Sequence, residues 1–62
     1  MEAYDRLVKL VQEVADDVMK AEGGNKAAGT RVRKHMQQIK QAAQDVRVGV
    51  LESRDDGSDG GT

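Results

Sequence analysis

Apolar residues recur at alternating spacings of three and four along two stretches of the chain, and one short polar segment separates the two. The first stretch comprises Tyr4, Leu7, Val11, Val14, Val18 and Ala21, and the second comprises Ala28, Val32, Met36, Ile39, Ala43, Val46 and Val50. On an α-helix this spacing gathers the side chains along one line. The chain also lacks proline. The pattern predicts an all-α protein with helices from about residue 2 to 21 and from about 26 to 51.

The segment between the two stretches reads Glu22-Gly23-Gly24-Asn25. A glycine just past a helix supplies the left-handed residue of a C-terminal cap, and Asn25 is a natural N-cap for the helix that follows. Because so short a connection forces neighbouring helices to lie antiparallel, we expect a helical hairpin domain over residues 1–52. Residues 53–62 contain only polar residues and glycine, which predicts a disordered acidic tail.

A hairpin of this size buries too little apolar surface to be stable by itself. The chain has no cysteine and one histidine, so disulfides and a metal cage do not supply the missing stability. We therefore expect a homodimer or a higher oligomer, with two hairpins forming a four-helix bundle or coiled coil. The residues expected to fill the core or the oligomer interface are Leu7, Val11, Val14, Val18, Val32, Met36, Ile39 and Val46.

Charge is distributed unevenly along the chain, although the formal net charge is only −1. Residues 1–25 hold three Lys/Arg against six Asp/Glu, and residues 48–62 hold one against four. Residues 26–47, in contrast, hold six Lys/Arg against one Asp/Glu. The second helix is therefore the part of the chain that would attract a polyanion.

Four basic residues are spaced seven apart through the second helix: Lys26, Arg33, Lys40 and Arg47. Because residues seven apart differ by only about 20° around a helix, these four, the basic stripe, share one line. Arg31 and Lys34 add charge near the helix start, and the array suits phosphate contact. The alternative is that the stripe forms salt bridges between helices or subunits, with Asp5, Glu13, Asp16 and Asp17 as possible partners.

Neither a catalytic site nor a small-molecule site is apparent in the sequence. No nucleophile is paired with a base, and no glycine motif would cradle a phosphate. His35 falls near the apolar line and is expected to be a packed or boundary residue. We expect no enzyme activity, no cofactor and no small-molecule substrate. No stretch approaches the roughly 20 apolar residues of a membrane span or resembles a signal peptide, which predicts a cytoplasmic protein.

The run Gly-Asn-Lys-Ala-Ala-Gly-Thr-Arg-Val-Arg-Lys, from Gly24 to Lys34, resembles the turn and second-helix start of a bacterial histone-like family. That family is typified by the chlamydial linker-histone-like DNA-condensing proteins. The resemblance covers roughly residues 3–50, and outside the motif it rests on pattern rather than identity.

The resemblance implies a helical hairpin that binds DNA in the bacterial nucleoid without enzyme activity. Carried over to the motif, it places phosphate contacts on Lys26, Thr30, Arg31, Arg33 and Lys34, whereas Lys40 and Arg47 are candidates from the basic stripe alone. The chlamydial members have a long basic C-terminal tail, and here acidic residues and glycine follow the hairpin. We therefore expect a short form that binds DNA through its folded domain.

Overall fold

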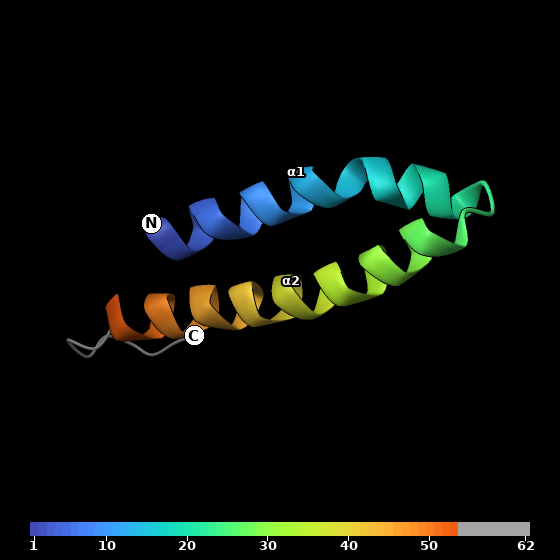
Figure 1. Ribbon diagram of the computed structural model, residues 1–62. Helices are drawn as coiled ribbons and strands as arrows, with labels where there is room; N and C mark the ends of the chain where they lie inside the picture. Colours follow the sequence, from blue (N-terminus) through green and yellow to red (C-terminus); the bar gives the residue numbers. More distant parts are fainter. Residues whose placement is uncertain (54–62) are drawn as a thin grey trace.

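Two α-helices lie side by side and antiparallel in the computed structural model, which describes residues 1–53 (Figure 1). α1 spans Glu2–Glu22 and α2 spans Lys26–Ser53, and these residues contain no strand. The predicted all-α antiparallel hairpin is confirmed, with helix ends one or two residues beyond the expected ones. The predicted tail lies outside the described residues, apart from Ser53, which ends α2.

The connection between the helices is tight because each of its residues satisfies a helix end. Gly24 adopts a left-handed conformation with φ of 100°. Its N–H donates to the carbonyl of Ala21 at 3.0 Å, and the N–H of Asn25 donates to the carbonyl of Lys20 at 3.0 Å. These two bonds form a Schellman motif, which closes α1. The Asn25 side-chain Oδ1 then accepts from the Ala28 N–H at 2.9 Å, so Asn25 is the predicted N-cap of α2.

The seam between the helices follows a line slightly rotated from the predicted one. On α1 it runs through Ala3, Leu7, Leu10, Val14, Asp17 and Ala21, and on α2 through Ala28, Val32, His35, Ile39, Ala42, Val46 and Gly49. All of these residues are buried or half-buried, and Val14, Ala28 and Ala42 are the buried ones. The heptad spacing is therefore as predicted, and half-buried His35 fits the prediction of a packed or boundary residue.

Six residues predicted for the apolar lines lie outside this seam; Val18 and Ala43 are half-buried, and the other four are exposed. Tyr4 is 54% exposed, Val11 49%, Met36 42% and Val50 42%, and each follows a seam residue by one position. Val11 and Met36 therefore do not fill the core of the single hairpin, and their place in an oligomer interface stays a prediction. The reason for their exposure is steric: the observed line on α2 contains Ala28, Ala42 and Gly49, and small residues let two helices approach closely.

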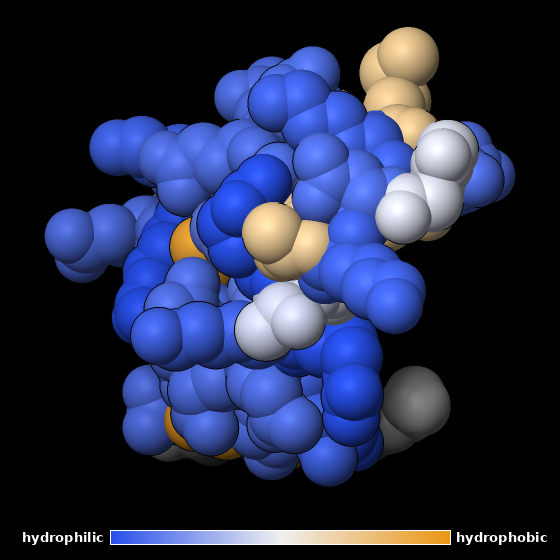
Figure 2. Space-filling view, turned by 45° about the vertical axis from the view of Figure 1, so that its right-hand side comes forward, coloured by the Kyte–Doolittle hydropathy of each residue, from blue (hydrophilic) through white to orange (hydrophobic). Residues whose placement is uncertain are grey.

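Close approach is visible at the open end of the hairpin. A Cβ built on Gly49 would lie 3.1 Å from the Met1 Cε, so the start of α1 packs directly against the α2 backbone. The last turn of α2 extends past the start of α1 (Figure 1). At the opposite end, which carries the turn, the surface is mostly hydrophilic with small hydrophobic patches (Figure 2). Within residues 1–53, neither helix combines the length and apolar composition that crossing a membrane requires.

Candidate nucleic-acid interface

The basic stripe lies on an exposed face of α2. Each member of the stripe is exposed and comes one position after a residue of the seam line. For Lys26 the preceding residue is Asn25, which continues the seam line by one heptad before Val32. A rise of 1.5 Å per residue places them about 10 Å apart, so the stripe is roughly 30 Å long. In the part of the chain that the structure describes, none of the four forms an ion pair.

Of the acidic residues that could have paired with the basic stripe, Asp16 and Asp17 are engaged elsewhere. Asp16 pairs with Lys20 of its own helix at 3.2 Å, and Asp17 pairs with Arg31 at 2.9 Å. Glu13 lies 3.9 Å from the Nε2 of His35. Within the single hairpin, the positive charge of the stripe is therefore directed toward solvent.

The face beside the basic stripe is polar and carries no acidic residue between Lys26 and Gln44. A shallow hollow on this face is lined by Gln37, Lys40, Gln41 and Gln44. The first acid along α2 is Asp45, whose carboxylate accepts from the Gln41 side-chain amide at 3.0 Å and lies 3.8 Å from Arg6 of α1. The outer face of α2 thus offers cations and neutral amides, which suits a ligand that carries many negative charges.

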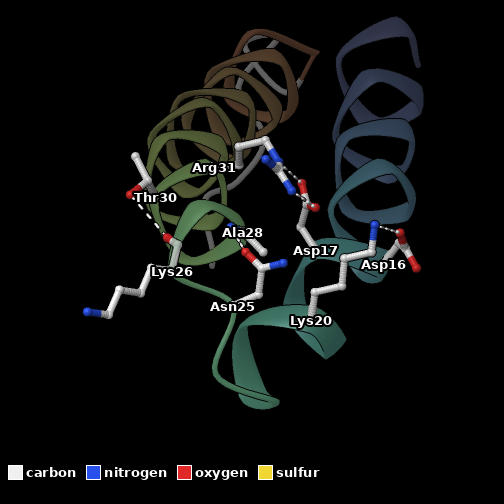
Figure 3. A network of polar contacts seen from close by, with 8 residues as sticks. All are labelled: Asp16, Asp17, Lys20, Asn25, Lys26, Ala28, Thr30 and Arg31. Carbon is white, nitrogen blue, oxygen red and sulfur yellow. Dashed lines mark hydrogen bonds and ion pairs between the residues drawn. The ribbon is translucent and has the colours of Figure 1, made fainter.

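In the first turns of α2, the side chains of the Gly24–Lys34 motif point in different directions. The Lys26 side chain projects away from α1 (Figure 3). The Thr30 hydroxyl donates to the Lys26 carbonyl at 3.3 Å, so this hydroxyl would have to rotate before it could donate to a phosphate. Arg33 and Lys34 are exposed on the outer side of the helix. Lys26, Arg33 and Lys34 are accordingly the motif residues with unobstructed charged groups.

Arg31 is oriented differently, because it reaches across the seam to α1 (Figure 3). Its Nε donates to the Asp17 Oδ2 at 3.0 Å and its Nη2 donates to the Oδ1 at 2.9 Å. This bidentate hydrogen bond raises the pKa of Arg31 and lowers the pKa of Asp17. Arg31 therefore acts as an interhelical clasp in this structure, and the structure does not bring it together with the basic stripe.

The clasp predicts a specific pH dependence of stability. The hydrogen bond from Arg31 holds the pKa of the Asp17 carboxyl below its usual value of 3.8, so the stabilisation is present above that value. It is lost as the pH falls through the lowered pKa of the folded hairpin. We expect Asp17→Asn to have a lower Tm than the wild type at pH 7, and the two Tm values to converge as the pH falls through the lowered pKa of Asp17.

Circular dichroism melts at several pH values would measure both Tm curves. Asp16→Asn is the matched control, because it removes a neighbouring carboxylate that pairs only within α1. Its Tm should follow the wild-type curve in shape. A constant Tm difference between Asp17→Asn and the wild type as the pH falls from 7 through the lowered pKa of Asp17 would contradict the role of the clasp.

No candidate metal centre accompanies the basic face. Among residues 1–53, no group of three or more His, Asp or Glu side chains could hold a metal ion. The Nε2 of His35 is buried and has no hydrogen-bond partner within the described part of the chain, and Glu13 lies 3.9 Å from it. His35 is thus part of the interhelical packing.

Fold and charge together define a small all-α hairpin protein whose outer helix face is basic and carries no acidic residue between Lys26 and Gln44. The chain belongs to the family described as "Histone H1-like protein Hc1", whose sequence profile matches residues 1–56. This match confirms the resemblance seen in the Gly24–Lys34 motif. Membership of a histone H1-like family indicates a DNA-binding nucleoid protein. No curated protein and no solved structure matches the chain.

Proposed function

We propose that the hairpin binds the phosphate backbone of DNA through the outer face of α2, without strong sequence preference and without enzyme activity. The observation that carries this proposal is the exposed basic stripe, which has no ion-pair partner within residues 1–53. The protein would act as a nucleoid-associated protein of the cytoplasm. Membership of the histone H1-like family supports DNA over other polyanions.

The residues of the face differ in the contacts they can make. Lys26, Arg33, Lys40 and Arg47, joined by Lys34, would contact phosphates. Thr30 would contribute a hydrogen bond after rotation of its hydroxyl. Arg31 would contribute mainly through the long-range electrostatic attraction of its positive charge for DNA, because its guanidinium is hydrogen-bonded to Asp17. Because phosphate contacts position a protein without reading bases, this set favours binding with little sequence discrimination. A stripe of roughly 30 Å is close to one turn of B-DNA, which measures about 34–36 Å.

The active species in this proposal is a homodimer or a higher oligomer. The exposed apolar side chains of Tyr4, Val11, Met36 and Val50 support it, because a single hairpin leaves them in water. Oligomerisation would also multiply the number of phosphates engaged by one particle.

The salt dependence of binding tests the mechanism. If a dimer engages about six phosphates, the logarithm of the binding constant should fall with the logarithm of the salt concentration with a slope near −5. Fluorescence anisotropy with a labelled duplex of about 20 base pairs, at several salt concentrations, would give this slope. Absence of detectable binding at roughly 50 mM salt would refute the proposal.

A second candidate function is a protein-interaction or assembly module in which the basic stripe forms salt bridges between subunits. The position of the stripe favours it, since the stripe borders the line that contains Met36 and Val50. Reversal of the stripe's charge distinguishes the two functions: the oligomer should persist if the stripe binds DNA and should dissociate if the stripe joins the subunits.

A further inference from the structure

The two sides of the helix seam have opposite chemistry. Arg6, Glu13, Arg31 and Asp45 each precede a seam residue by one position, and all four take part in the cross-helix polar contacts. Within residues 1–53, eight large apolar side chains are exposed, and four of them, Tyr4, Val11, Met36 and Val50, each follow a seam residue, whereas Val48 precedes one. In a pair of antiparallel helices, residues that precede the seam on either helix lie on one side of the pair, and residues that follow it lie on the other side. One side of the hairpin therefore carries the ion pairs. The opposite side, here called the apolar side, carries Tyr4, Val11, Met36 and Val50.

The apolar side is wider on α1 than on α2. On α1, Met1, Val8, Ala15 and Val18 lie beside Tyr4 and Val11. On α2, the line is narrow and consists of Gly29, Met36, Ala43 and Val50, with the basic stripe along its outer edge. The two helices thus present a broad apolar strip and a narrow apolar line edged by cations.

We propose that a second copy of this chain covers the apolar side, with α1 of each copy packed over α2 of its partner. This inference rests on the homo-oligomer in the proposed function and is independent of DNA. Two-fold packing of these faces permits either this arrangement or one that places α2 over the partner's α2. The second arrangement brings the two basic stripes together, and like charges at close range oppose it.

Packing α1 of one copy over α2 of its partner suits both the apolar side chains of the apolar side and the cations along its edge. The aliphatic stems of Arg33 and Lys40 would cover apolar side chains on a partner's α1 while their charged groups remain in water. The acidic residues on the edge of α1, Asp5 and Glu22, lie near its two ends. They would face the ends of the basic stripe and leave its centre free for phosphates.

The absence of cysteine from the sequence permits a direct test by disulfide cross-linking. Val11 and Met36 lie at nearly the same level of the hairpin, because Glu13 faces His35 across the seam. A mixture of the Val11→Cys and Met36→Cys variants should form a linked heterodimer on oxidation, at least about tenfold more than either variant by itself, since a disulfide needs Cα atoms within about 7 Å. Both positions are exposed, so neither substitution removes a seam contact.

The control is a mixture of Val11→Cys with Gln38→Cys, whose position lies on the ion-paired side and should not link. Sedimentation equilibrium of the wild type without DNA gives the mass of the oligomer. Equal or stronger linking of Val11→Cys to itself would overturn the proposed arrangement in favour of α1 over α1. If the wild type is monomeric and no mixture forms a cross-link, the proposal that a second copy covers the apolar side is refuted, whether or not the hairpin binds DNA.

Discussion

Replacement of Arg33 and Lys34 by glutamate in one variant is expected to lower DNA affinity by at least about 100-fold, because phosphate neutralisation supplies most of non-specific binding. Both side chains are exposed and neither forms an ion pair within residues 1–53, so their reversal removes charge from the binding face without breaking a seam contact. Anisotropy with a labelled duplex at about 50 mM salt would measure the loss, and circular dichroism would verify that helicity is retained.

The matched control replaces Lys9 and Lys20 of α1 by glutamate. This variant changes the net charge of the chain equally but leaves the outer face of α2 intact. Its loss of affinity should be much smaller than that of the Arg33/Lys34 variant. Equal losses would show that total charge, and not the α2 face, controls binding.

Sedimentation of the Arg33/Lys34 variant separates the two candidate functions. In the DNA-binding proposal, the oligomer persists after the double reversal, because the apolar side still holds the copies together. In the assembly-module alternative, the same reversal dissociates the oligomer, because it removes the salt bridges between subunits. A variant that dissociates and also retains DNA affinity would favour the alternative.

Ala42→Leu is expected to remove a large part of the stability of the hairpin and to lower its Tm. Ala42 is 0% exposed and lies in the seam where the helices are close. Insertion of a larger side chain into a packed core costs about 1–3 kcal/mol, and a chain below about 70 residues rarely has more than 3–5 kcal/mol of stability. A thermal melt followed by circular dichroism would record the change as a lower Tm and a smaller helical signal at 25 °C.

Ala27→Leu provides the same substitution at an exposed position of the same helix. Leucine and alanine are both good helix formers, so this control should melt within a few degrees of the wild type. An Ala42→Leu variant as stable as Ala27→Leu would show that the seam does not require a small residue at position 42.

The sequence alone predicted the helices and the turn because local chemistry determines them. Gly24 is the only glycine with a positive φ within residues 1–53, and Asn25 caps α2 as its type predicts. The rotation of the helices about their axes could not be read in the same way. On α1, Leu10 and Val11 are adjacent and both apolar, and the choice between them depends on which line of α2 permits close packing.

The basic stripe was predictable from spacing because its four members share one helix. The role of Arg31 was not, since it depends on a partner 14 residues away on the other helix. A signal existed: Asp17 continues the heptad line of Ala3 and Leu10, where an acid is unusual. A charged residue on such a line calls for an opposite charge across the seam.

The separation of the basic stripe from the apolar side gives the two kinds of association opposite responses to added salt. Ions compete with the stripe for phosphates, whereas burial of side chains such as Tyr4 and Val11 persists, and salts such as sulfate reinforce it. A sulfate wash should therefore elute the protein from a DNA column as an intact assembly. The same particle would rebind on desalting without having to refold or reassemble.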